Sequence, residues 1–382
     1  MHSDTADTLA VHFFTIVLNG RPFIEYHAER FARLSCEWHW HVVEGVAALR
    51  HDTAWSVAHG GSISQALHDN GRSNDGTSEY LDALVERYPD RVTVYRKPPG
   101  EFWDGKIEMV RAPLANLPRT CLLWQVDADE LWTVSQIETL RRMFLADSGR
   151  MAAFFLCSFF VGPNLVATGV DNYGNNRGYE WLRAWRYQTG DQWVAHEPPR
   201  LSRPRPDGSL VEVVALGAFL HEETAIAGLM FQHFAYATRE QLEFKEVYYG
   251  YRGAVASWER LNGEVSFPRR LADFFPWVQD AAGVEHCSRA QVRPLAYPLA
   301  GDTGEKCWTF DPEPPPLNLD AVKCLLAQAS PLRRRTVVVG GENPVVPLTL
   351  DLVRAVAVLL LQDLDAVVRN LWSLRAVRKA LP

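Results

Sequence analysis

LLWQVDADELW, residues 122–132, is the stretch of sequence on which the expected fold rests. Its apolar, strand-forming residues lead into three acidic residues in four positions and then return to large apolar side chains. Ligands of open α/β sheets bind at the carboxyl edge, where parallel strands end. Side chains alternate along an extended chain, so Asp127 and Asp129 should lie on the same side. Two close carboxylates repel each other unless a cation lies between them, and hard oxygen ligands favour Mg²⁺ or Mn²⁺.

Two other interpretations of these acids remain open. Asp127 and Asp129 could instead cap the helix that follows them, since acidic side chains are common at helix N-termini. Phosphatases of the haloacid dehalogenase type also carry Asp-x-Asp after a strand. That motif normally lies in the first strand and has Thr or Val two places after the second Asp, where this chain has Leu131.

The stretch resembles the DxD motif of GT-A glycosyltransferases, and WQVDADELW is similar to a version in bacterial family-2-like proteins. The resemblance covers approximately residues 11–260. It implies an α/β, GT-A (Rossmann-like) fold, in which a mixed sheet is flanked by helices. The implied reaction is metal-dependent transfer of a sugar from a nucleoside diphosphate donor, first of all a UDP-sugar, to a hydroxyl of a glycan or other acceptor, with inversion. Asp127 and Asp129 would then hold Mn²⁺ or Mg²⁺, and Asp127 would also contact the donor.

Apolar patterning predicts the order of the elements. Strands are expected over 11–18, 38–43, 91–95 and 151–160, and the main helices over 23–34, 78–88, 134–145 and 238–251. A strand–helix–strand opening is typical of a parallel, nucleotide-binding α/β layer. We therefore expect one domain over residues 1–260, with a nucleotide half at 11–160 and an acceptor half at 161–260.

Further donor and metal contacts are expected outside the acidic stretch. Glu44 ends the second strand, where the resemblance implies a contact to the nucleotide; a solvated acid is the alternative. Lys106 and Arg111 belong to a helix that opens near residue 104, and phosphates favour helix N-termini with a nearby cation. His233 follows the strand-like run 226–231, and the resemblance implies a histidine here that completes the metal site.

An inverting transferase needs a carboxylate that takes the proton of the acceptor hydroxyl. Glu197, Glu222 and Glu223 are the available acids in the second half, and we favour Glu222, with Glu197 as the second candidate.

The chain also departs from the family pattern after Glu44, because roughly thirty residues of loop-like composition precede SNDGT at 73–77. Asp75 in that motif is expected to cap the next helix.

Composition excludes some other classes of protein. The 382 residues are 47% hydrophobic and 22% charged, with a formal net charge of −7, which argues against a nucleic-acid partner. Six cysteines lack a CxxC pair, and His286-Cys287 is more typical of an incidental pair than of a zinc site. Without a secretion signal or an apolar stretch long enough to span a bilayer, we expect a cytoplasmic protein with reduced thiols.

The C-terminal part differs in pattern from the rest. Residues 261–330 are Pro-rich and predict an irregular segment, and residues 331–382 predict an amphipathic helix. Its apolar stripe could pack on the protein's own core, form a homodimer, or lie on an anionic membrane surface.

Two rival functions stay open at this stage. One is a non-catalytic protein of the same fold that binds a sugar or nucleotide. The other is a metal-dependent phosphohydrolase or nucleotidyltransferase that uses the same carboxylates.

Overall fold

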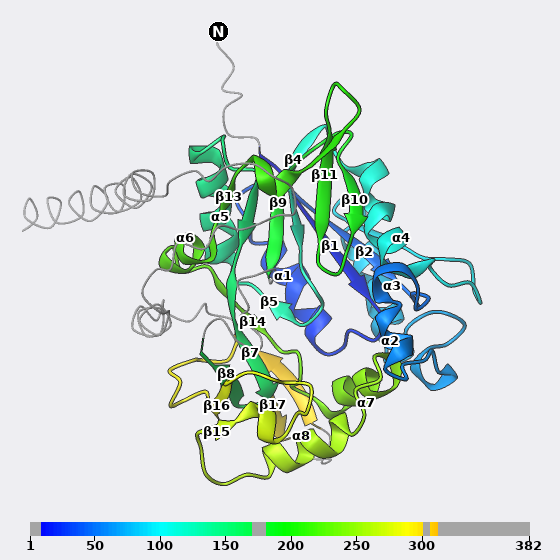
Figure 1. The fold of residues 1–382 in the computed structure, drawn as a ribbon. Helices are drawn as coiled ribbons and strands as arrows, with labels where there is room; N and C mark the ends of the chain where they lie inside the picture. Colours follow the sequence, from blue (N-terminus) through cyan, green and yellow to red (C-terminus); the bar gives the residue numbers. More distant parts are fainter. Residues whose placement is uncertain (1–8, 170–180, 301–305, 312–382) are drawn as a thin grey trace, which may run out of the picture. The chain divides into compact units, whose positions relative to one another are not determined.

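The computed structural model describes residues 9–169, 181–300 and 306–311. A seven-stranded sheet in the order β13-β6-β9-β4-β1-β2-β3 lies at its centre (Figure 1). Neighbouring strands are parallel except around β9, which is antiparallel to both β4 and β6. With helices packed against it, this mixed sheet confirms the predicted α/β, GT-A-like (Rossmann-like) fold class. The strands are β1 (Val11–Val17), β2 (Trp38–Glu44), β3 (Val92–Tyr95), β4 (Thr120–Gln125), β6 (Ala152–Phe154), β9 (Leu182–Gln188) and β13 (Ala218–Phe219).

Large apolar side chains cover both faces of the central sheet. On one face Phe13 stacks on Phe31 of helix α1 (His27–Phe31), with ring centroids 3.8 Å apart. On the other, Phe14 packs against Trp193, at 5.5 Å between centroids. Consecutive residues of β1 thus serve opposite faces, as strand geometry requires. Further helices near this sheet include α3 (Thr77–Arg87), α4 (Gly105–Arg111) and α5 (Val134–Ala146). Trp193 belongs to a small sheet of β10 (Gln192–Ala195), β11 (Arg200–Pro204) and β12 (Leu210–Glu212).

A second, six-stranded sheet begins where the acidic stretch ends. After β4 the chain turns through residues 126–129 and enters β5 (Glu130–Leu131), which pairs antiparallel with β14 (Met230–His233). The register places His233 opposite Glu130, and therefore next to the DxD turn. The order of the sheet is β15-β16-β8-β7-β14-β5; its other strands are β7 (Leu156–Gly162), β8 (Leu165–Thr168), β15 (Arg269–Arg270) and β16 (Gly283–His286).

Several elements differ from the sequence-based expectation. The run 151–160 forms two strands, β6 and β7, which belong to different sheets. The run 226–231 holds the end of helix α6 (His221–Ile226) and the start of β14 rather than one strand. Its apolar residues do not alternate cleanly, and periodicity cannot separate a buried helix from a buried strand over so short a run.

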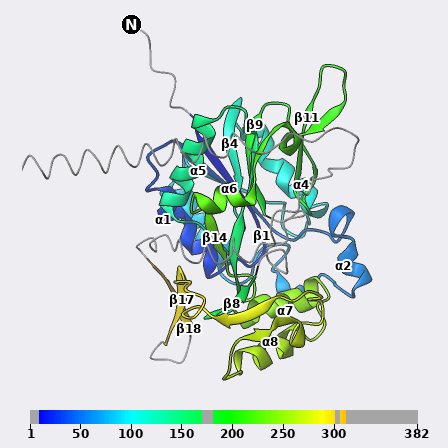
Figure 2. The same cartoon turned by 60° about the vertical axis from the view of Figure 1, so that its left-hand side comes forward.

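The segment 261–330, expected to be irregular, contains strands in its described part. β16 pairs with β8, so this segment completes a sheet of the preceding domain instead of following a boundary at residue 260. β17 (Ala296–Ala300) and β18 (Lys306–Phe310) form a hairpin, visible in Figure 2. Trp308 of the hairpin packs edge-on against Phe23, at 4.9 Å. The expected C-terminal helix at 331–382, and with it the expected dimer contact, lies outside the described residues.

Helix α7 (Arg239–Tyr248) begins as predicted, at a capping box made by Thr238 and Gln241. It packs against α8 (Ala254–Asn262), and Figures 1 and 2 both show the two helices side by side. Among the described residues, no helix is both long and apolar enough to cross a membrane.

The insert between β2 and α3, residues 46–72, is fastened to the end of α7. Ser62 N donates to Val247 O (2.9 Å), and Ser56 Oγ donates to Tyr248 O (2.5 Å). Gly250 has a φ of +75°, and a Cβ there would lie 2.6 Å from His59 O, so this close approach requires glycine. The insert, which contains α2 (Trp55–Ala58), is therefore packed against the C-terminal end of α7 and belongs to the same domain.

Three histidines on the neighbouring strands β1 and β2 predict that the protein loses stability in acid. His12 Nδ1 lies 3.0 Å from His41 Nε2, and the His39 ring lies 4.4 Å from that of His41. Burial, and then the neighbouring His39, lowers the pKa of His12 to about 4; burial lowers the pKa of His39 and His41 too. The unfolded chain, with histidine pKa values near 6.5, binds protons that the folded protein excludes. The free energy of unfolding is therefore not reduced by these histidines above pH 6.5, and it decreases as the pH falls towards 4.

We expect the free energy of unfolding, measured by urea denaturation, to fall by roughly 1 kcal/mol or more per pH unit between pH 6.5 and 4.5. His41→Asn should reduce this slope, whereas His59→Asn, at an exposed histidine, should leave it unchanged. Equal slopes for the three proteins would show that the cluster does not govern the acid response.

Candidate functional site

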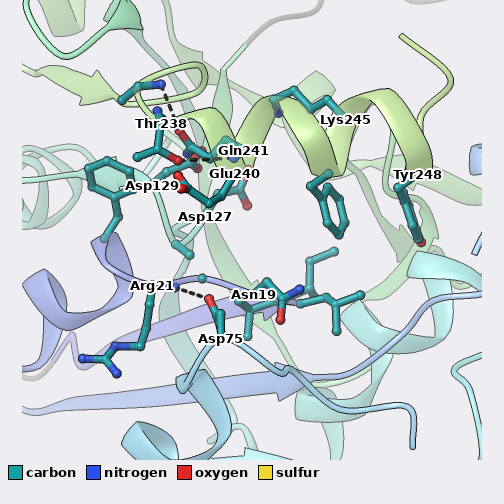
Figure 3. Close-up of a pocket in the computed structure, with 18 of the residues that line it drawn as sticks. Asn19, Arg21, Asp75, Asp127, Asp129, Thr238, Glu240, Gln241, Lys245 and Tyr248 are labelled. Atoms are coloured by element: carbon teal, nitrogen blue, oxygen red, sulfur yellow. Dashed lines mark hydrogen bonds between the residues drawn. The ribbon is translucent and has the colours of Figure 1, made fainter. Parts of the chain in front are cut away.

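A cavity of about 1670 Å³ opens at the carboxyl ends of β1 and β4. Figure 3 shows Asn19 and Arg21 from the loop after β1 on one side and residues of α7 on the other, with Asp127 and Asp129 between them. The insert contributes a further wall that includes Trp55. Pockets for one small ligand commonly measure about 300–1,000 Å³, so this cavity has room for two.

Asp127, Asp129 and His233, predicted as metal ligands, all line this cavity. Asp129 Oδ1 lies 3.4 Å from His233 Nε2, and Gln241 Nε2 donates to Asp129 Oδ2 at 3.1 Å. Burial favours a raised pKa for Asp129, but His233, and behind it Lys245, outweigh burial and lower the pKa to about 2. Asp129 is therefore an ionised carboxylate at neutral pH.

The chemistry of this donor set fits a divalent cation in part. Neighbouring ligand atoms on an octahedral ion with bonds of about 2.1 Å lie about 3 Å apart, close to the separation of Asp129 and His233. His233 Nδ1 is buried and lacks a hydrogen-bond partner within the described chain. Within the described part of the chain, however, no group of three or more His, Cys, Asp or Glu side chains is arranged to hold a metal. A cation here would need ligands from a substrate or water.

A buried ion pair between Arg183 and Glu130, not anticipated from the sequence, holds the turn at residues 126–129. Arg183 of β9 donates to Glu130 Oε1 from both Nε (2.9 Å) and Nη2 (2.7 Å). Arg183 Nη2 also lies 3.5 Å from Asp127 Oδ2, and Glu130 Oε2 accepts from Asp127 N at 3.3 Å. Burial raises the pKa of Glu130 to about 7 against the lowering effect of Arg183. The only signal in the sequence is that each charge lies next to large apolar residues, Glu130 before LW and Arg183 within LRAW.

Glu197, the second candidate for the catalytic base, also lines the cavity. It forms an ion pair with Lys106 of α4, and Trp55 Nε1 donates to its Oε2 at 3.3 Å. Asp52 Oδ2 accepts from the backbone N–H groups of His196 (2.6 Å) and Glu197 (3.0 Å), which fixes the loop. Burial favours a raised pKa for Glu197, but Lys106 outweighs it and lowers the pKa. The carboxylate is ionised and held by side chains from separate elements.

The structure does not bring Glu44 to the cavity. Glu44 is 1% exposed, and its Oε2 lies 2.5 Å from Nε of Arg96. It also accepts hydrogen bonds from Ser73 N at 3.1 Å and from the Ser78 hydroxyl. The residues that follow the insert thus occupy the carboxylate, so Glu44 holds this loop in place rather than facing a ligand.

Arg111, Glu222 and Glu223 are likewise not among the residues that line the cavity. Arg111 Nη2 donates to Trp193 O at 2.8 Å. Glu222 lies on α6, and its neighbour Glu223 pairs with Arg150 at 2.9 Å. Of the predicted acids in the second half, the structure places only Glu197 in the site.

Asp75 lies at the cavity and directly precedes Gly76, which is the N-cap of α3, so it does not occupy the cap position that was expected. Its Oδ1 accepts from Thr77 N at 3.0 Å at the start of α3, and its Oδ2 accepts from Arg21 N at 3.0 Å. Figure 3 shows the second bond as a dashed line. The carboxylate thereby joins the loop after β1 to the loop before α3.

Comparison with known proteins finds no matching family model and no matching curated protein. Among solved structures, the 1–349 chain of S. aureus TarS aligns with a TM-score of 0.29 and 11% identity over 47% of each chain. Another S. aureus TarS structure aligns with a TM-score of 0.29 and 10% identity over 47% of this chain and 28% of that one. The protein thus spans about half or less of these chains.

A 4-diphosphocytidyl-2C-methyl-D-erythritol synthase aligns with a TM-score of 0.26 and 13% identity over 48% of this chain and 76% of that one. Matches this distant do not define an activity, which we infer below from the geometry of the site.

Proposed function

We propose that the protein is a metal-dependent glycosyltransferase that moves a sugar from a nucleoside diphosphate donor to an acceptor hydroxyl. One observation carries this proposal: a single cavity, large enough for two ligands, joins Asp127, Asp129 and His233 to the ionised Glu197. The first group suits a cation bound to a diphosphate, and the second suits acceptance of a proton. A UDP-sugar is the first donor to test.

A divalent cation, Mn²⁺ or Mg²⁺, held by Asp129 and His233 beside Asp127, would supply positive charge to the departing diphosphate. Gln241 orients the Asp129 carboxylate from α7, and the Arg183–Glu130 pair orients Asp127 from β9. These contacts keep the ligand oxygens in place before a substrate binds, which is the preorganisation that makes electrostatic stabilisation effective.

Glu197 is proposed as the base of an inverting transfer. The acceptor oxygen forms a bond to the anomeric carbon, the bond from that carbon to the diphosphate oxygen breaks, and the diphosphate leaves with the electron pair. The acceptor proton passes to a Glu197 carboxylate oxygen. Lys106 keeps this carboxylate ionised before the reaction, because the pair lowers its pKa. Glu197 replaces Glu222 as the favoured base, since Glu222 does not line the cavity.

The test is calorimetric titration with UDP in the presence and absence of Mn²⁺. We expect Mn²⁺ to tighten UDP binding by about tenfold or more, equivalent to roughly 1.4 kcal/mol, and Asp129→Asn to abolish this gain. Asp207→Asn, at an exposed acid outside the cavity, is the matched control. Failure to bind both UDP and GDP would overturn the proposal. In turnover assays, release of UDP or GDP identifies a glycosyltransferase, whereas release of phosphate or pyrophosphate identifies one of the rival enzyme classes.

A further inference from the structure

A row of neighbouring aromatic rings extends from Glu197. Trp55 and Tyr249 line the cavity and stack in parallel, with centroids 5.7 Å apart and an interplanar angle of 4°. Tyr251 follows at 6.0 Å from Tyr249 and stacks on Trp277 at 4.8 Å. All four side chains are partly exposed, and Trp55 is 36% exposed. We call these four residues the aromatic row.

Hydrogen bonds hold the first two rings of the aromatic row, Trp55 and Tyr249, without a bound ligand. Trp55 lies on the insert, which is fastened to α7 by the bonds of Ser56 and Ser62 described above. Tyr249 Oη accepts from Lys106 Nζ at 2.9 Å, and Trp55 Nε1 donates to Glu197. Flat rings that are already held by hydrogen bonds lose less entropy when a ligand stacks on them.

We propose that the aromatic row is the acceptor subsite and that it binds a carbohydrate chain. Its sugar rings would stack along the row while a hydroxyl at the chain end reaches Glu197. This inference rests on the proposed function, since it names the acceptor class of the same site. A pyranose has a flat apolar face and a polar edge, which matches aromatic faces whose tips make polar contacts.

Charge and polarity disfavour other acceptors. The chain has a formal net charge of −7, which opposes a polyanion such as a nucleic acid. A lipid chain would meet the Trp55 N–H and the Tyr249 hydroxyl, both of which are engaged with charged partners. A neutral sugar chain carries no charge that the protein would repel, and its hydroxyl groups suit the polar tips of Trp55 and Tyr249.

The experiment measures binding of three neutral tetrasaccharides, cellotetraose, maltotetraose and chitotetraose, by calorimetry and tryptophan fluorescence. At least one should bind the full-length wild-type protein. Tyr251→Ala should weaken that binding about tenfold, Tyr251→Phe should preserve it, and Tyr297→Ala, at an exposed tyrosine of β17 outside the cavity, should leave it unchanged. Because Tyr251→Phe keeps the ring, its retained binding separates stacking from loss of the fold.

Parallel titration with UDP and Mn²⁺ separates this proposal from the function on which it rests. UDP binding without binding of any tetrasaccharide would overturn the acceptor subsite alone. Equal affinity of Tyr251→Ala and wild type for the bound tetrasaccharide would do the same. Tetrasaccharide binding that depends on Tyr251, without binding of UDP or GDP, would overturn the glycosyltransferase and retain a carbohydrate-binding aromatic row. Absence of all binding would overturn both.

Discussion

Glu197→Gln should lower kcat for sugar transfer by about 10²- to 10⁴-fold, because an amide cannot take the acceptor proton. The amide keeps the size of the side chain and can still accept from Trp55 Nε1, so the KM of the donor should change by only a few-fold. Initial rates at saturating donor, with UDP release as the readout, separate these two parameters.

Since Lys106 lowers the pKa of Glu197, the wild-type rate should stay level from neutral pH down to the ordinary titration range of glutamate, near pH 4–5.

Glu222→Gln is the matched comparison, because it makes the same chemical change at the acid that sequence spacing favours but that does not line the cavity. We expect it to turn over at close to the wild-type rate. A large loss in Glu222→Gln with little effect of Glu197→Gln would reverse the assignment. Wild-type rates in both variants would point to a mechanism without a protein base, such as a retaining transfer.

Arg183→Met should lower the free energy of unfolding by about 3–5 kcal/mol, the usual cost of leaving one partner of a buried ion pair alone. Glu130 is fully buried, and burial already raises its pKa to about 7 with Arg183 in place. Without the guanidinium, the carboxylate must remain charged in an apolar site or take up a proton. Urea denaturation at pH 8 measures the loss.

A double variant, Arg183→Met with Glu130→Leu, tests the cause of this loss. Removal of both charges leaves no uncompensated group, so most of the stability should return. Activity should not return, because Asp127 loses the contacts that orient it. Arg200→Met, at a half-exposed pair with Glu212, is the surface control and should have little effect on stability. A double variant no more stable than Arg183→Met would show that packing, rather than charge, accounts for the loss.

Local sequence patterns predicted the elements that carry their own signal. β1, β2 and β4 are rich in large apolar residues, and three acidic residues in four positions mark the turn after β4. Helix α7 was predictable because Thr238 and Gln241 form a capping box within four residues. These features depend on near neighbours in the chain, and the structure has them at nearly the expected positions.

Features that depend on distant partners were not predictable. Glu130 and Arg183 are 53 residues apart, and either alone looks like a solvated charge. Glu44 is buried only because Arg96, Ser73 and Ser78 reach it from beyond the insert. The insert itself has the composition of a loop, and nothing local shows that Ser56 and Ser62 bond to α7. Choosing between Glu197 and Glu222 likewise required knowing which of the two segments, the turn after β10 or helix α6, faces the cavity.

The turn at residues 126–129 is also the crossover between two layers, because β4 belongs to the central sheet and β5 pairs with β14 in the other. His233 ends β14, so a ligand held jointly by the turn and His233 touches both layers at once. Sliding of one layer over the other would separate these groups and stretch every bond to that ligand. A ligand bound there would therefore cross-link the two layers and raise the resistance of the molecule to shear.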